Sequence, residues 1–121
     1  MLPAHAEAAE GSAYVGSERV PLVPLDAVVP QYMRQGDRMF VKIDTQGYEW
    51  SVLDGAPRTL EDAVGVICEL SLVPLYEGQH LWLDIVERME SMGFTLWYLQ
   101  RGFTDAATGR SLQVDAAFFR H

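Results

Sequence analysis

The order of apolar and polar positions predicts alternating strands and helices in the middle of the chain. Residues 39–44 and 64–69 are two short, largely apolar runs that each end in an acidic residue, and such runs are typical of buried strands. Between them, residues 52–60 carry apolar side chains at the spacing of one helix face. Gly55 and Pro57 interrupt this stretch, so we expect two short helices in place of one.

A similar pattern continues to the end of the chain. Residues 82–89 place apolar side chains at i, i+3, i+4 and i+7, opposite charged ones, which predicts an amphipathic helix that ends at Gly93. Residues 94–100 and 112–119 predict two more strands, the last with clear alternation. The residues between these strands fit a loop and no helix, so we expect the two strands to form an antiparallel pair.

The segment before the first buried strand has a different character. Residues 20–25 are apolar but contain two prolines, which favours an edge strand or an extended segment. Asp26 resembles an N-cap and predicts a short helix at about 26–35 that ends at Gly36. Residues 1–18 show no sustained period and are expected to form a flexible or extended arm.

The predicted elements follow the order strand, helix, strand, helix, strand, strand. Strands joined by helices are expected to run parallel through right-handed crossovers, and strands without alternation fit a sheet that is covered on both faces. We therefore expect residues 19–121 to form one α/β domain. Its sheet would be open and mostly parallel, with an antiparallel last strand at one side.

The acidic composition narrows the choice of partners. Asp and Glu number 17 against 9 Lys plus Arg, so the net charge is -8 at pH 7. Such a chain repels phosphate backbones and anionic membrane surfaces, which argues against nucleic acid and membrane as partners. No apolar run approaches the length of a membrane span, the N-terminus lacks signal-peptide features, and the single Cys68 allows no internal disulfide. These features favour a soluble, cytoplasmic protein.

Two acids, Asp44 and Glu69, end the two buried strands. Ligands of open α/β sheets bind beyond the carboxyl ends of the strands, so both carboxylates could face one crevice. There they could act as a general base, bind a cation, or hold a substrate hydroxyl or amine. The structural alternative is that each caps the segment that follows or pairs with an arginine.

The densest polar cluster follows the first of these strands, at residues 42–49. Gly47 would let the backbone turn sharply out of the strand, and Glu49 would favour the positive end of the next helix. Lys42 and Asp44 point to the same face of the sheet because side chains repeat every two residues. An ion pair between these two is the alternative to a catalytic role for Asp44.

Further candidates lie in the second half of the chain. Tyr76 and Glu77 belong to a loop after the second strand that could overhang the crevice or form an ordinary surface turn. Asp115 is an acid inside an otherwise apolar strand, where a bond to backbone or arginine is the structural alternative. No histidine shares a metal-ligand spacing with Cys68, so no metal site is expected.

The familiar cofactor loops are missing. No two glycines are separated by a single residue, so the sequence has neither the G-x-G turn of dinucleotide sites nor a glycine-rich phosphate loop. It also has no G-x-S-x-G nucleophile elbow. An α/β sheet without such a loop either does not use a nucleotide or is incomplete.

A family resemblance appears in the polar cluster and its flanks. Residues 42–49, followed by residues 52–56, resemble the "KID-x-E/Q-G-x-E-x-x-VL-x-GA" signature of the FkbM-type methyltransferases. Pro24-Leu25-Asp26 is similar to the "LD" that precedes this signature, and residues 69–78 resemble the segment after the next strand. The residues from Thr108 to Arg120 resemble the family's C-terminal ending. The similarity runs from about residue 19 to the end, and even the first three residues resemble a stretch in the family's middle.

The resemblance implies an enzyme that transfers a methyl group from S-adenosylmethionine, usually to a hydroxyl of a sugar or small metabolite. Its fold would be a Rossmann-like, seven-stranded sheet in which residues 39–44 form the fourth strand. By this resemblance the catalytic residues are Asp44 and Glu69, with Asp44 also at the periphery of the cofactor site. The substrate-binding residues would be Gln46, Tyr48 and Tyr76, whereas Gly47 and Glu49 would form a structural turn and cap.

One large departure from the family concerns its N-terminal half. The family's glycine-rich loop and the acid that holds the ribose precede the "LD" segment, so this chain resembles the C-terminal half alone and is expected to be inactive by itself. The fourth strand would then present an open edge. A second copy, the missing half, the N-terminal arm or a rearranged segment could cover that edge. Two alternatives to an enzyme are a non-catalytic remnant that binds a partner or itself, and a small acidic binding module with a coincidental signature.

Overall fold

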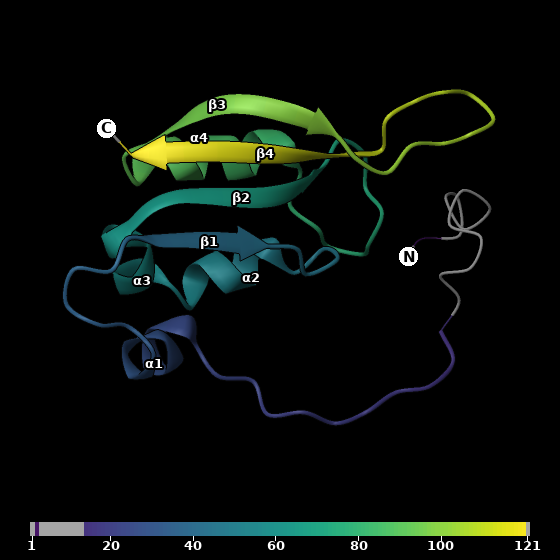
Figure 1. Ribbon diagram of the computed structural model, residues 1–121. Helices are drawn as coiled ribbons and strands as arrows, with labels where there is room; N and C mark the ends of the chain where they lie inside the picture. The colour runs from purple at the N-terminus through teal and green to yellow at the C-terminus, as the bar shows by residue number, and fades with distance from the viewer. Residues whose placement is uncertain (1, 3–13, 121) are drawn as a thin grey trace.

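A four-stranded mixed sheet forms the centre of the computed structural model, which describes Leu2 and residues 14–120 (Figure 1). In chain order the strands are β1 (Met39–Ile43), β2 (Ala63–Ser71), β3 (Phe94–Arg101) and β4 (Gln113–Arg120). In space their order is β1-β2-β4-β3, with β1 and β2 parallel and β4 antiparallel to both of its neighbours. The expected antiparallel pairing of the last two strands is confirmed.

The position of β4 corrects the expectation of an antiparallel strand at one side of the sheet. This strand lies between β2 and β3, and β3 forms the edge. The helix α4 (Trp82–Ser91) connects β2 to β3, which does not pair with β2. The loop after β3 then leads back to β4, which pairs with both β2 and β3. The first three strands still point in one direction, as the crossover rule predicts.

Three helices cover one face of the sheet (Figure 1). They are α2 (Glu49–Asp54), α3 (Pro57–Asp62) and α4. Gly55 is the C-cap of α2 and Pro57 opens α3, which confirms the predicted split into two short helices. The core lies between these helices and alternate residues of the strands, and its buried members include Val66, Cys68 and Leu70 of β2 with Leu53, Leu60, Ile85 and Met89 of the helices.

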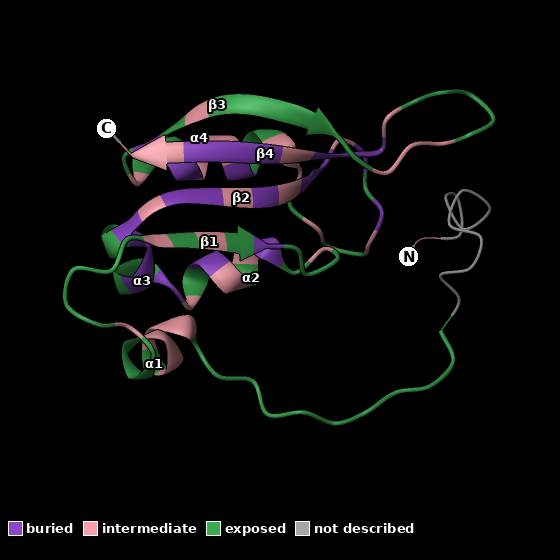
Figure 2. Cartoon of the chain, viewed as in Figure 1, coloured by how far each residue is buried: buried purple, intermediate pink, exposed green. Residues whose placement is uncertain are grey.

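The opposite face of the sheet has no helix over it among the described residues, so the expectation of a sheet covered on both faces is wrong. Phe40 is 48% exposed and Trp97 is 61% exposed on this side, and β3 is largely green in Figure 2. The Phe119 ring contacts the rings of Phe40 and Trp97, with centroids 5.8 and 4.8 Å away. These aromatic side chains cover β2 themselves, which explains why its sequence does not alternate. The Phe40 ring packs closely on Gly65 of β2, where an added Cβ would lie only 2.7 Å from the ring.

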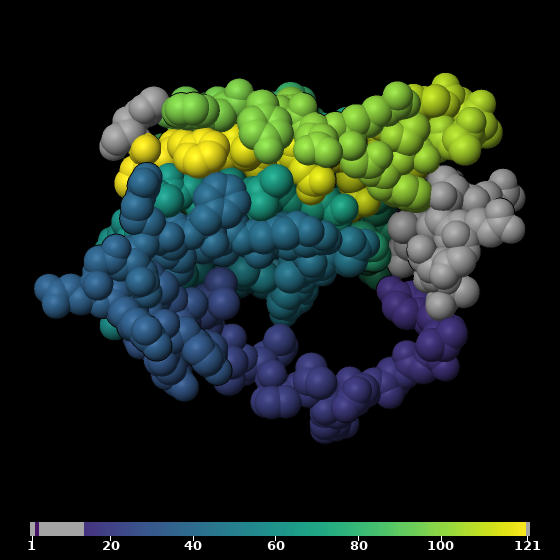
Figure 3. Space-filling model, viewed as in Figure 1, coloured from purple at the N-terminus to yellow at the C-terminus, as the bar shows by residue number. Residues whose placement is uncertain are grey.

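The segment before β1 folds differently from its prediction. In place of one helix over 26–35 there is a single helical turn, α1 (Leu25–Val28), followed by the short 3₁₀ turn η3 (Val29–Gln31). Pro30 falls at the start of that turn, where its ring interrupts the α-helical bonding. Residues 14–24 form no strand, so the extended alternative remains for residues 20–24, and Leu25 already belongs to α1. Figure 3 shows this segment arching away from the sheet. The remainder of the predicted arm, residues 1 and 3–13, lies outside the described residues.

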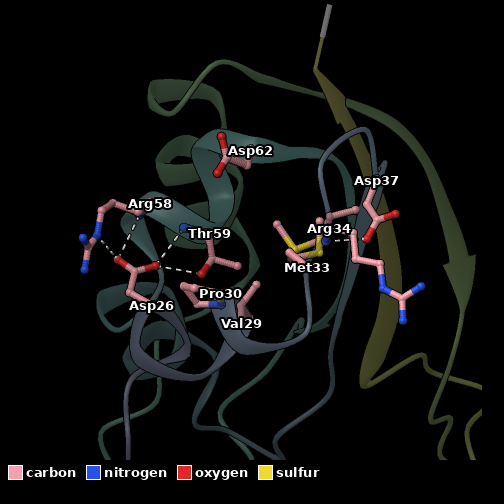
Figure 4. Close-up of a pocket in the computed structure, with 10 residues that line it drawn as sticks. Asp26, Val29, Pro30, Met33, Arg34, Asp37, Arg58, Thr59 and Asp62 are labelled. Atoms are coloured by element: carbon pink, nitrogen blue, oxygen red, sulfur yellow. Dashed lines mark hydrogen bonds and ion pairs between the residues drawn. The ribbon is translucent and has the colours of Figure 1, made fainter.

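Asp26 is not the N-cap of its own helix, which corrects the sequence interpretation. The N-cap of α1 is Pro24. The Asp26 carboxylate instead accepts hydrogen bonds from the backbone N–H groups of Thr59 (2.7 Å) and Arg58 (3.0 Å), at the start of α3 (Figure 4). Burial raises the pKa of Asp26, but these two backbone bonds and the nearby Arg58 charge together hold it below its ordinary value. An acid that caps a helix 33 residues away joins the N-terminal segment to the domain.

Candidate active site

A group of polar side chains gathers on the open face of the sheet, where β1 and β2 end. Asp44 follows β1 directly, and Glu69 lies near the end of β2. The side-chain amide of Gln46 donates to both, at 3.0 Å to Asp44 Oδ1 and 3.1 Å to Glu69 Oε2. The structure therefore brings the two predicted catalytic acids together, with one glutamine between them.

The loop after β1 gives Gln46 this position. Gln46 is the one described non-glycine residue with a positive φ, at 55°, and Gly47 follows with φ 97°. The Tyr76 ring lies directly over Gly47, where an added Cβ would come within 2.5 Å of Tyr76 Cδ2. The Tyr76 hydroxyl donates to Gln46 Oε1 at 2.8 Å. Gly47 thus permits both the turn and the close approach of Tyr76.

Glu49 holds the same loop from the core side. It is the first residue of α2, as expected, and is only 5% exposed. Its Oε1 accepts hydrogen bonds from the backbone N–H groups of Thr45 (3.0 Å) and Gly47 (3.1 Å) and from the Thr45 hydroxyl (3.2 Å). Its carboxylate is therefore used within the loop and does not reach the open face.

Lys42 and Asp44 form the ion pair that the sequence left as an alternative, with 3.1 Å between Lys42 Nζ and Asp44 Oδ2. The hydrogen bond that Lys42 donates to Asp44, together with the Asp44 charge, raises the pKa of Lys42. The pair is solvent-exposed and therefore adds little to stability. Because 35% of the Asp44 side chain remains accessible, the pair does not close this carboxylate to a ligand.

Glu69 is held from a second side by Gln113, the first residue of β4. The Gln113 amide donates to Glu69 Oε2 at 2.8 Å. Burial, followed by the negative charges of Asp44, Glu49 and Asp115, raises the pKa of Glu69 to about 7. A carboxyl group with this pKa is half ionised near neutral pH, which suits proton exchange with a substrate.

Two glutamines of this site were not singled out from the sequence. Gln113 is one of them. The other is Gln79, whose Oε1 accepts hydrogen bonds from the N–H groups of Leu75 and Tyr76 and whose amide donates to Ser71 at 2.6 Å. Gln79 therefore holds the loop that carries Tyr76. Gln113 and Asp115 are polar residues two apart in an apolar strand, and this spacing was the signal that could have identified Gln113.

The remaining candidates, Tyr48, Glu77 and Asp115, lie around this network or away from it. Tyr48 is 53% exposed and lines a hollow of about 540 Å³ together with Lys42, Thr45 and the segment from Leu22 to Leu25, on the β1 side of Asp44. Asp115 faces Glu69 across the β2–β4 ladder. Glu77 is exposed at a turn. A second hollow, of about 520 Å³, lies beside Asp26 and Met39 at the other end of β1 (Figure 4), away from Asp44 and Glu69.

Two further findings concern metals and membranes. Among Leu2 and residues 14–120, no three His, Cys, Asp or Glu side chains are placed to share a metal ion. Within the same residues, no helix has the length and apolar character needed to cross a membrane. The candidate site itself consists of two bridged carboxylates, a lysine and a tyrosine.

The comparisons with known proteins give one match. A family model described as the methyltransferase FkbM domain matches residues 2–96. The match begins before residue 19, where the sequence resemblance was expected to start, and ends within β3, so β4 with Gln113 and Asp115 lies beyond it. No curated protein and no solved structure matches the chain.

Proposed function

Because the chain belongs to the FkbM methyltransferase family, we propose that its polar cluster binds the acceptor of a methyl transfer, a hydroxyl group of a sugar or small metabolite. S-adenosylmethionine would be the methyl donor. The observation that supports this proposal is the Gln46 amide that bridges Asp44 and Glu69. An ionised carboxylate can only accept hydrogen bonds, so two of them at one accessible place suit a ligand that donates hydroxyl protons.

The residues would contribute mainly by positioning the acceptor. Methyl transfer is a direct displacement, and holding the reacting oxygen in line accounts for much of such a rate enhancement. Asp44, at the end of β1, would accept a hydrogen bond from the acceptor. Glu69 and Tyr76 would line the acceptor side, and Tyr48 would border the neighbouring hollow.

The described residues fit the methyl donor only in part. Negative charge around Asp44 suits a cationic sulfonium group, and the hollow beside Tyr48 is adjacent to it. The chain has no glycine pair of the G-x-G type with which to cradle the rest of the donor. We therefore place Asp44 alone at the periphery of a donor site and assign no other residue to it.

Calorimetric titration of the 121-residue chain with S-adenosylmethionine and with its demethylated product tests the donor. We expect no binding at micromolar concentration, because most donor-binding residues would have to come from an N-terminal half. Micromolar binding would contradict the view that this chain carries only the acceptor side.

The acceptor role is tested by Asp44→Asn, which should reduce methyl transfer by the complete enzyme with little change in thermal stability. If Asp44→Asn simply unfolds the protein, Asp44 is structural.

A second candidate function is a non-catalytic half-domain that binds a partner or a second copy. It is supported by β1, which pairs with β2 alone among the described strands, and by the exposed aromatic side chain of Phe40 on this strand. A second exposed aromatic side chain, Trp97, lies on the other edge strand, β3. An unpaired edge next to apolar surface favours association. Light scattering over a range of concentrations separates the candidates, since a monomer at every concentration would exclude self-association.

A further inference from the structure

Asp44 and Glu69 differ in how their oxygens are occupied. Both oxygens of Asp44 are engaged, Oδ1 by the Gln46 amide and Oδ2 by the Lys42 ammonium. Glu69 receives both of its hydrogen bonds, from Gln46 and Gln113, on Oε2 alone. Among the described residues, Glu69 Oε1 therefore accepts no hydrogen bond, and it is the carboxylate oxygen best placed to take a proton.

We infer that Glu69 Oε1 accepts the proton of the acceptor hydroxyl, and that Gln46 and Gln113 are positioning residues that hold Glu69 for this step. The inference rests on the proposed function. In the step, the acceptor O–H bond breaks, the proton goes to Oε1 and the electron pair stays on the acceptor oxygen. That oxygen then attacks the methyl carbon of an S-methyl sulfonium donor, and the electron pair of the broken C–S bond stays on sulfur.

The orientation of the Gln46 amide follows from its partners. The Tyr76 hydroxyl donates to its carbonyl oxygen, so the NH₂ group must face the two carboxylates. A flipped amide would set its oxygen against both of them. Asp44 is left with the role of orienting the acceptor, because its charge is already shared with Lys42.

The surroundings of Glu69 favour a proton on it near neutral pH. The charged groups around it are Asp44 and Lys42 at β1, Glu49 on α2 and Asp115 on β4. The Tyr76 hydroxyl, from the loop after β2, is a neutral neighbour. Burial and the three negative charges raise the pKa of Glu69 to about 7, while the Gln113 bond opposes this shift. A base of this pKa can take a hydroxyl proton as the reaction proceeds and release it to water.

Carbon-13 NMR of the carboxyl groups in the labelled 121-residue chain tests the inference without an activity measurement. The resonance that Glu69→Gln removes belongs to Glu69 and should titrate near pH 7. Asp44→Asn should lower its midpoint, and Gln46→Met should raise it by removing a donor to the carboxylate. Gln31→Met, on η3, is the matched control and should change nothing. A midpoint near the ordinary value of about 4.3, or no response to Gln46→Met, would overturn the inference.

A transfer assay separates this inference from the proposed function. The assay follows tritium from labelled S-adenosylmethionine to a mixture of monosaccharides, with any N-terminal half of the enzyme present. Glu69→Gln should reduce kcat by about 10²- to 10⁴-fold with a small change in KM, and Gln46→Met should shift the pH profile. Transfer that survives Glu69→Gln would refute the inference and leave the function standing. No transfer by the wild type would refute both.

Discussion

Glu69 of β2 and Asp115 of β4 face each other directly across the antiparallel ladder. Like charges at such positions are unfavourable, and Asp115 is one of the charges that raise the pKa of Glu69. This pair therefore opposes stability at the carboxyl end of β2 and accounts for part of the raised pKa of Glu69.

Replacement of Asp115 by asparagine should stabilise the protein. At pH 8, where Glu69 is mostly ionised, we expect the free energy of unfolding to rise by about 0.2–1 kcal/mol, because one of two opposed charges is removed. Urea denaturation measures this change. Glu90→Gln on the exposed side of α4 removes the same charge elsewhere and is the control. A gain of equal size in the control would mean that net charge alone is responsible.

The pH dependence of stability should carry the signature of Glu69. Its pKa is raised in the folded state, so the folded protein binds more protons than the unfolded chain between about pH 4.5 and pH 7. Stability therefore falls as pH rises through that window. The loss is on the order of 1 kcal/mol, well below the full linkage value, because the carboxyl is only half buried.

The difference between the wild type and Glu69→Gln isolates this effect from all other titrating groups. Urea denaturation at pH 5 and at pH 8 should show that the variant loses less stability over this range than the wild type. Parallel pH profiles of the two proteins would mean that the Glu69 pKa is not raised.

Replacement of Gly47 by alanine should disrupt the site. The positive φ at Gly47 and the Tyr76 ring 2.5 Å from an added Cβ both oppose a side chain. We expect a loss of about 1–3 kcal/mol in unfolding free energy, with Tyr76 displaced from Gln46.

Gly78→Ala is the matched control for Gly47→Ala. Gly78 also has a positive φ, at 68°, but nothing lies within 4 Å of an added Cβ. Thermal unfolding of the two variants should therefore differ by the steric contribution of Tyr76. Equal losses would show that backbone strain alone is at work.

Asp26→Ala should lower the melting temperature by several degrees, because α3 loses the side chain that caps its first turn. Asp26→Asn retains a hydrogen-bond acceptor and should cost less. Since the pKa of Asp26 is lowered in the folded state, its stabilisation is complete above the ordinary aspartate pKa and disappears as pH falls below it. Circular dichroism at pH 7 and at pH 3 measures both effects. An alanine variant that melts with the wild type at pH 7 would show that the cap is unimportant.

The strands and the longest helix could be predicted from the chain because their apolar spacing reflects local geometry. The amphipathic pattern of residues 82–89 became α4, and Gly55 and Pro57 separated α2 from α3 through backbone preferences of their own. The helix expected over 26–35 was wrong because a proline in its first turns favoured a short 3₁₀ segment. The sequence was sufficient to predict an element where the residues of that element by themselves determine its backbone conformation.

The two acids of the candidate site, Asp44 and Glu69, could be predicted from the sequence. The hydrogen bonds by which Gln46 joins them could not. Asp44 and Glu69 could be expected near one another because parallel strands end at the same edge of a sheet. The role of Gln46 depends on a positive φ in the loop and on Tyr76, 30 residues away. Gln113 reaches Glu69 because β4 lies next to β2, and no periodicity predicts that insertion.

By itself, the sequence determined the element types, the family and the two acids, because all three depend on residue type and spacing along the chain. The tertiary structure alone decided that β4 lies between β2 and β3, that one face of the sheet stays open, and that Asp26 caps a distant helix. These outcomes depend on which surfaces meet after the chain has folded. That choice is governed by packing and by hydrogen bonds between residues far apart in sequence, so short-range patterns carry little information about it.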